Sequence, residues 1–344
     1  MPFTARILHR PNHRPNGRCE KVPDVMDLIR RFALLFTAAT TALVLAGCGG
    51  EPTKANAAAI VGDDRVSLDS VQSEVQWLLD NVPDMQQLKQ EDKLGLLSRH
   101  IVQTRVRHQL VEAAARQQGL SADPRAIDEL LQQVGGAKQA PSQFGVEASK
   151  VREFASDYVL LQELGDHNLD RISVEFVGAY ISGESPEQTA KEKALELGRK
   201  IAADPDRAKE LSEEIGTEVI DQSVSLRELA SGQQTALLAA SPLFSADEGT
   251  VVVTQPSPQQ GSLWLVALVE DRQVGGGSGG ASGQPVPPQL LAEIGIQQLA
   301  PYAAEQGVEI SPRFGVWNQA SVAIAENEDA VASYLLPARV ASEQ

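Results

Sequence analysis

The chain has 344 residues, 42% of them hydrophobic, and a formal net charge of −16. This length allows two domains with cores of their own, and the acidic balance argues against binding to nucleic acid or electrostatic docking on anionic lipid. Aromatic residues make up only 4% of the chain, which argues against clefts that stack sugars.

Residues 1–25 form a preface rich in Pro, Arg and His that precedes a compact signal-like segment beginning at Met26. We therefore predict that Met1 is not the true start, and leave the preface out of the fold prediction. His9, His13 and Cys19 lie within it, at a spacing that fits no zinc-binding pattern.

An export signal is predicted over residues 26–47. Arg30 and Arg31 precede an apolar run, Phe32 to Ala46, which ends in small residues before Cys48. A basic segment, a short apolar segment and small residues before a cleavage point define such a signal. The run is too short to span a bilayer, which needs about 20 apolar residues.

The run Leu-Ala-Gly-Cys at residues 45–48 resembles the lipobox of bacterial lipoproteins. The resemblance implies cleavage before Cys48, lipidation of its sulfur and anchoring at the extracytoplasmic face of the cell membrane, where two acyl chains hold firmly. The alternative is an ordinary secretory signal with an incidental cysteine, or an uncleaved anchor. Cys48 is the only cysteine left after cleavage, so disulfides, thiolate catalysis and cysteine-based metal sites are excluded.

A polar tether over residues 48–56 leads into a segment predicted to be mainly helical, residues 57–170. It opens with two short β-prone runs around Gly62 and Asp63, which indicate a hairpin, and Ser67 is placed to cap the first helix. Apolar spacing then predicts helices over about 68–82, 91–119, 123–133 and 146–169. His100 and His108 are eight residues apart, which does not favour a metal site.

Residues 171–274 are predicted to form a separate small lobe of strands and helices. Strands are expected at 172–181, 250–254 and 262–270, and helices at about 186–202, 207–215 and 225–238. Residues 275–288 are rich in Gly, Ser and Pro, with no Lys for a phosphate-binding loop, so they are predicted to be a linker.

The remaining segment, residues 289–344, is too small to bury itself. We expect a helix over 289–306 and strands at 308–310 and 321–325. The hairpin at residues 58–66 offers these strands a partner. The C-terminal segment is therefore predicted to fold back onto the N-terminal helices.

This plan resembles the SurA/PrsA family of exported foldases. The run Ala-Ile-Val-Gly-Asp-Asp-Arg-Val-Ser at residues 59–67 is similar to the opening hairpin of their chaperone domain, and residues 244–251 and 261–266 are similar to parvulin turns and strands. The run Pro-Arg-Phe-Gly at residues 312–315, followed by Trp317, is similar to the tail of SurA-like lipoproteins of high-GC Gram-positive bacteria. The resemblance implies an α+β fold, with a helical chaperone domain closed by the C-terminal helix and strands, and a small parvulin-like lobe. It implies unfolded or newly exported polypeptides as partners, and no cofactor or metal.

The lobe departs from the parvulin pattern at two positions. Parvulins carry a His on the first strand and another on the last, and the corresponding residues here are Gly178 or Ala179, and Leu263. No catalytic residue is therefore assigned. Phe244, Trp264 and Leu263 are the candidate peptide-binding residues, although for Phe244 and Trp264 a role in the core or a pocket wall is favoured over direct ligand contact.

Three functions remain open from the sequence. The first is an anchored extracytoplasmic chaperone whose lobe binds chain but isomerises poorly. The second is an active peptidyl-prolyl isomerase, and the third is a non-enzymatic envelope scaffold. Arg313 and Trp317 are predicted to form a cation–π latch that is structural rather than ligand-binding.

Overall fold

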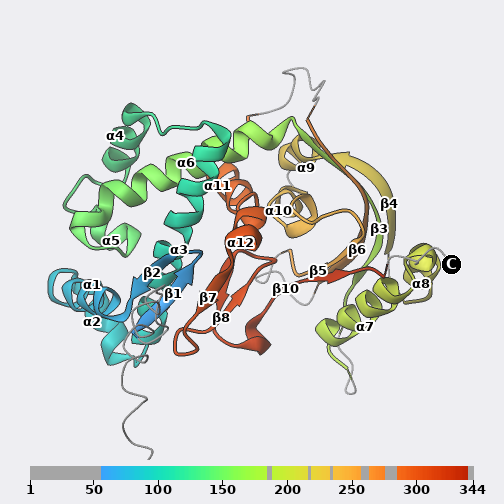
Figure 1. Ribbon diagram of the computed structural model, residues 1–344, viewed down its shortest axis with the longest axis horizontal. Helices are drawn as coiled ribbons and strands as arrows, with labels where there is room; N and C mark the ends of the chain where they lie inside the picture. Colours follow the sequence, from blue (N-terminus) through green and yellow to red (C-terminus); the bar gives the residue numbers. More distant parts are fainter. Residues whose placement is uncertain are drawn as a thin grey trace, which may run out of the picture. The chain divides into compact units, whose positions relative to one another are not determined.

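The computed structural model describes residues 56–183, 188–215, 218–232, 235–256, 263–275 and 285–339. All of them belong to one compact unit, residues 52–344. The fold is α+β, as expected: a helical part carries one small sheet, and a second part is built on a larger sheet (Figure 1).

The N-terminal half is mainly helical, and side chains set where its helices begin and end. Ser67 caps α1 by accepting a hydrogen bond from the Ser70 amide, Pro83 begins α2, and Gly119 ends α3 in the left-handed region (φ 67°). The helices are α1 (Leu68–Asn81), α2 (Pro83–Gln90), α3 (Leu94–Gln118), α4 (Pro124–Gln133), α5 (Ala140–Phe144) and α6 (Val151–Leu169), the last preceded by the short turn η1 (Ala148–Lys150).

A three-stranded antiparallel sheet joins the start of this half to the C-terminal segment. The strands β1 (Ala57–Val61) and β2 (Asp64–Ser67) form the expected hairpin, and β7 (Val308–Ile310) pairs with the other side of β1. Ala59 lies opposite Ile310 in this pairing. Residues 308–310 therefore pair with the hairpin as predicted, whereas the strand expected at 321–325 pairs with residues 316–318 instead.

The larger sheet has five antiparallel strands in the order β10-β5-β6-β3-β4. They are β3 (Ile172–Ile181), β4 (Glu218–Ser225), β5 (Thr250–Thr254), β6 (Trp264–Val274) and β10 (Ser333–Pro337). Side chains alternate between its two faces, so each face has its own core. One face packs on α7 (Ala190–Ala203) and α8 (Ala208–Ile215), which the turn η2 (Pro205–Arg207) connects, and the other on α9 (Leu226–Ser231), α10 (Ala236–Ala239) and η3 (Pro242–Phe244).

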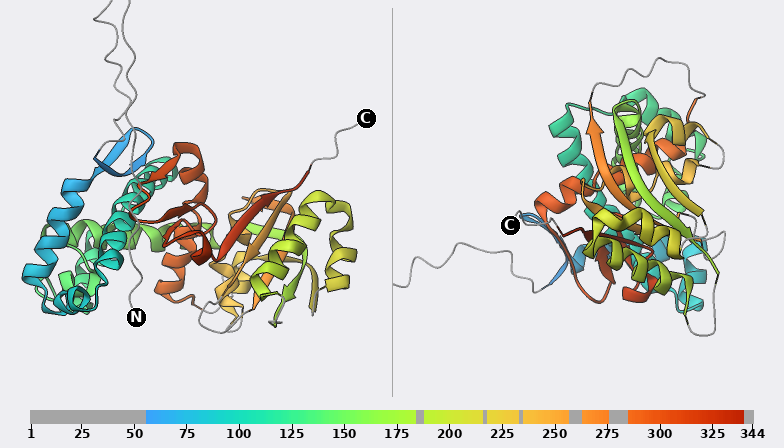
Figure 2. Two further views of the ribbon diagram at one scale, coloured as in Figure 1. Left: turned by 90° about the horizontal axis from the view of Figure 1, so that it is seen from below. Right: turned by 90° about the vertical axis from the view of Figure 1, so that its right-hand side faces the viewer.

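Two of these strands correct the sequence prediction. Residues 218–225 form β4, which was not expected, and the helix predicted over 225–238 is two short helices with residues 233–234 outside the described part. Residues 333–337 form β10, which pairs with β5 in the larger sheet and not with the N-terminal helices. Figure 2 shows this last strand, in dark red, lying along the sheet.

The C-terminal helix expected over residues 289–306 is also divided. It consists of α11 (Pro288–Gln297) and α12 (Ala300–Gln306), and a two-stranded ladder of β8 (Val316–Asn318) and β9 (Ala323–Ala325) follows, with the short turn η5 (Glu328–Ala330) before β10. Residues 276–284, most of the predicted linker, lie outside the described residues.

The pair of helices α6 and α11 connects the helical half to the larger sheet (Figure 1). Leu161 of α6 and Ala292 of α11 belong to the core of the helical half, whereas Leu169 and Ile294 belong to a core of the sheet. Two glycines bring the backbones together. A Cβ atom at Gly165 would overlap the backbone oxygen of Leu291, and one at Gly295 would overlap that of Leu161.

Candidate functional site

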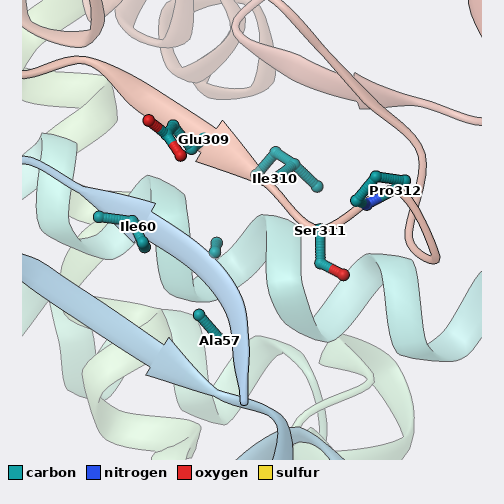
Figure 3. Close-up of a pocket in the computed structure, with 7 residues that line it drawn as sticks. Ala57, Ile60, Glu309, Ile310, Ser311 and Pro312 are labelled. Carbon is teal, nitrogen blue, oxygen red and sulfur yellow. The ribbon is translucent and has the colours of Figure 1, made fainter. Parts of the chain in front are cut away.

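A small pocket lies beside strands β1 and β7 (Figure 3). Its volume is about 210 Å³, and its lining residues are Ala57, Ala59, Ile60, Glu309, Ile310, Ser311 and Pro312. Ala57 and Ala59 are buried, while Ile60 and Ile310 are half-buried and form its apolar part. The amide of Ser311 donates to the Ala58 oxygen at 2.9 Å, so the strand pairing continues along the pocket. Such a pocket has room for an apolar side chain.

A larger pocket, of about 420 Å³, is lined mainly by charged and polar side chains. They come from β2, α1, α3, the turn before α6 and the start of α6, and are Arg65, Ser70, Ser73, Glu74, Arg105, His108, Gln109, Glu147, Lys150 and Glu153, with Val66. The lining carries charges of both signs, which distinguishes this pocket from the one beside β1.

Arg105 is the centre of an ion-pair network that joins three helices. Its guanidinium donates to Glu153 Oε1 of α6 at 2.8 Å and, through its other terminal nitrogen, to Glu74 of α1. The Glu74 side chain is only 5% exposed, and its second oxygen accepts from the Glu147 amide at 3.2 Å. Lys150 adds a contact with Glu153 at 3.2 Å. Both oxygens of the buried Glu74 carboxylate accept a hydrogen bond, so the network stabilises the packing of α1, α3 and α6.

His108 and Asp157 form a second polar link between α3 and α6. The ring nitrogen Nδ1 lies 2.9 Å from Asp157 Oδ2, and Nε2 lies 3.6 Å from Glu112. The hydrogen bond to Asp157 raises the pKa of His108, and burial raises the pKa of Asp157 against the opposing effect of His108. Burial also lowers the pKa of Arg107, the neighbouring residue on α3, to about 10, and the charge of Asp157 opposes that shift.

From the His108–Asp157 pair we expect the stability of the fold to fall as pH rises. Since the folded pKa of His108 lies above its ordinary value of 6.5, the folded chain binds more protons there than the unfolded chain. The stabilisation is fully present below pH 6.5 and is lost as pH rises through the higher folded pKa; the raised pKa of Asp157 acts in the same direction at lower pH. Melting temperatures measured across this window should decline more steeply for the native chain than for His108→Gln, and equal slopes would contradict the assignment.

The lobe residues chosen from the sequence do not come together as a binding site. Phe244 is fully buried among the side chains on the α9 and α10 face of the sheet, and Trp264 is buried in the core on the α7 and α8 face. Leu263, immediately before β6, is 43% exposed. Phe244 and Trp264 are therefore core residues in this structure, and only Leu263 offers surface to a peptide.

The positions that correspond to the first parvulin histidine are closed to a larger side chain. Gly178 lies in the middle of β3 between β4 and β6, where a Cβ atom would overlap the backbone oxygen of Val266. Ala179 is fully buried in the core against α7 and α8. An imidazole at either position would require the sheet or its covering helices to move.

The aromatic contact of Arg313 differs from the prediction. Its guanidinium lies 5.6 Å from the centroid of the Phe314 ring, whereas the indole nitrogen of Trp317 donates to Gln319 Oε1 at 2.9 Å. Phe314 is buried in the core of the helical half, and its backbone oxygen accepts from Arg99 of α3 at 2.9 Å. The cation–π contact of Arg313 is thus made with Phe314, beside the helical core.

Comparison with known proteins identifies the first part of the chain. Residues 26–147 match the family model of the SurA-like N-terminal domain. The chain carries a SurA-like N-terminal domain. The match supports the resemblance to SurA/PrsA-like chaperones and indicates a chaperone-type, extracytoplasmic role. A search of curated proteins finds no match.

The match to the SurA-like domain ends before α6, but the charged pocket is also lined by a residue of α6. Glu74, Arg105 and His108 lie within the matched residues, whereas Glu153 and Asp157 lie beyond them on α6. The residues after the match therefore complete the polar side of the domain.

The remaining sequence predictions concern the lipid anchor, membrane-spanning segments and metal sites. Cys48 and the signal segment lie outside the described residues. Of the helices in the described ranges, none has the length and apolar character to cross a membrane. Within those same ranges, no three or more His, Cys, Asp or Glu side chains are grouped to hold a metal ion.

The polar network of the SurA-like domain was missed from the sequence. Arg105 stands on the apolar stripe of α3, between Ile101 and His108 at helical spacing. A charged residue in an apolar stripe indicates a buried partner of opposite charge. The partners of Arg105 lie on other helices, so the residue spacing within α3 cannot identify them.

Proposed function

We propose that this protein is an extracytoplasmic chaperone that binds unfolded, newly exported polypeptides and is held at the membrane by a lipid on Cys48. The observation that carries the proposal is the SurA-like N-terminal domain at residues 26–147. The signal segment and the lipobox-like run supply the compartment and the anchor. The apolar pocket beside β1 gives the helical half a place for a client side chain.

The residues built on the larger sheet are proposed to form a parvulin-like lobe that binds chain and isomerises it poorly. The closed positions at Gly178 and Ala179 support the poor isomerisation. Residues 171–274 also contain no histidine and no cysteine, so the lobe lacks those acid–base groups.

An aggregation assay tests the chaperone proposal directly. The full chain is added in stoichiometric amounts to a chemically unfolded client, and light scattering follows aggregation. We expect slower aggregation and a complex with the unfolded client that the folded client does not form. If scattering is unchanged and no complex forms, the proposal fails. One stoichiometric envelope partner, captured even with excess unfolded competitor, would favour the scaffold function instead.

A peptide assay separates binding from catalysis. Proline isomerisation takes tens of seconds without a catalyst, so NMR exchange on an Xaa-Pro peptide measures any acceleration. The full chain is expected to give a rate close to the blank. A large acceleration would establish the isomerase function and reject the poorly active lobe.

Lipid anchoring predicts that Cys48→Ser releases the protein from the membrane. The serine variant cannot form the thioether, and its folded part is unchanged, since residue 48 precedes the first described strand. Fractionation should move the variant from the membrane to the soluble extracytoplasmic fraction, and mass spectrometry should detect the acyl chains only on the native chain. A native chain without acyl chains would reject the anchor.

A further inference from the structure

The larger sheet has two edge strands, β10 and β4. β10 pairs with β5 alone among the described strands, but it is only five residues long and ends in a proline, Pro337. At the opposite end of the strand order, β4 is hydrogen-bonded to β3 alone among the described strands (Figure 1). Alternate residues of such an edge strand direct their N–H and C=O groups away from the sheet, where another strand can bind them.

The edge formed by β4 is long and regular. β4 pairs with β3 in one unbroken register, from Ser173 opposite Ser225 to Tyr180 opposite Glu218. Proteins protect exposed edges with proline, lysine, a bulge or a very short strand. The sequence of β4, Glu-Val-Ile-Asp-Gln-Ser-Val-Ser, contains no proline or lysine, and no bulge interrupts its pairing with β3. Its central residues Asp221, Gln222 and Ser223 are exposed.

The two faces beside this edge differ in chemistry. Asp221 lies on the face of α8, near exposed Glu175 of β3 and exposed Glu270 of β6. Lys209 of α8 forms an ion pair with Asp221 at 2.7 Å, and its charge also acts on Glu270. On the other face, Ile220 is half-buried and packs against the core. An added strand would therefore meet carboxylates on one face and an apolar side chain on the other.

We propose that β4 is a docking edge for an extended segment of client polypeptide, and that it favours segments in which basic and apolar residues alternate. This inference rests on the chaperone function proposed above and names where part of the client binds. Main-chain hydrogen bonds make such recognition tolerant of sequence, while the period of two places basic side chains near Asp221 and apolar ones near Ile220. A second copy is the less favoured occupant, because edge-to-edge pairing would bring two acidic edges together.

Backbone methylation of a peptide probe tests the proposal. The probes are capped octapeptides of alternating lysine and valine, unmodified or N-methylated on every second residue in either of the two phases. The full chain should bind the unmodified peptide, and methylation in one phase should weaken binding at least ten-fold while the other phase weakens it less. A glutamate–valine octapeptide should bind at least ten-fold more weakly. Equal affinity for all these peptides overturns the proposal.

Cross-linking and edge variants locate the peptide. A photoreactive amino acid at Gln222 should cross-link to the lysine–valine peptide, and one at exposed Glu196 of α7 should not. Of Gln222 and Ser223, one directs its N–H outward, so one of Gln222→Pro and Ser223→Pro should keep the native melting temperature and lose at least five-fold in peptide affinity. Cross-linking that is stronger at Glu196 overturns the inference. So does a dimer, seen by sedimentation, that the folded proline variant abolishes.

The aggregation assay distinguishes a failure of this inference from a failure of the proposed chaperone function. If the full chain slows aggregation but no peptide cross-links at Gln222, the docking edge is rejected and the chaperone function stands. If aggregation is unchanged as well, both are rejected.

Discussion

Replacing Gly165 by alanine is expected to lower the free energy of unfolding by about 3 kcal/mol, near the upper end of what overpacking normally costs. The added methyl group would overlap the backbone oxygen of Leu291, and a backbone oxygen in a helix cannot rotate away. Gly295→Ala should lower the free energy of unfolding by a similar amount, because its methyl group would overlap the backbone oxygen of Leu161. For a chain of this size the expected fall in melting temperature is roughly 4–6 °C.

Gly95→Ala is the matched control for this substitution. Gly95 is exposed near the start of α3, and a Cβ atom there has open space around it. Alanine should stabilise that helix by about 0.5–1 kcal/mol, since glycine loses more backbone entropy on folding. If Gly165→Ala and Gly95→Ala melt at the same temperature, α6 and α11 are not held in close contact.

Replacing Arg105 by methionine is expected to destabilise the fold by about 3–5 kcal/mol, the usual cost of removing one partner from a buried ion pair. The Glu74 carboxylate would remain buried with only the Glu147 amide as a donor. Glu153 would lose a second contact at the same time. Chemical denaturation of the full chain, followed by circular dichroism, measures the change.

Arg152→Met provides the control on the same helical half. Its ion pair with Asp128 has the same types of group, but the two side chains are 59% and 57% exposed. A pair in that environment contributes about 0–1 kcal/mol. Equal destabilisation by the two methionine variants would show that the Arg105 network acts as a surface pair, contrary to its burial in the structure.

Local sequence patterns were enough to predict most helices and the strands with apolar runs. β4 was missed because its central residues Asp221, Gln222 and Ser223 are polar, as befits an exposed edge, so the run lacks the apolar alternation of a half-buried strand. β10 was missed because residues 333–337 pair with β5, which lies far away along the chain. Nothing in either run alone identifies its neighbour.

The site was less predictable than the fold, because its contacts join separate elements. Glu74 and Glu153 look like ordinary polar residues of their helices. Arg105 lies in the apolar stripe of α3, but only packing shows that these two carboxylates are its partners. Phe244 and Trp264 fit a pocket wall and a core equally well by residue type. Their burial on opposite faces of one sheet depends on strand register, which fixes the face of every side chain.

The pairing of β7 and β10 has a consequence for how this protein folds as it is made. The ribosome makes β7 after β1 and β10 after β5, yet β7 covers one side of β1 and β10 covers one side of β5. Until residues 308–310 and 333–337 emerge, β1 and β5 each present a bare edge of the kind that invites aggregation. The proposed chaperone therefore needs protection of its own during synthesis.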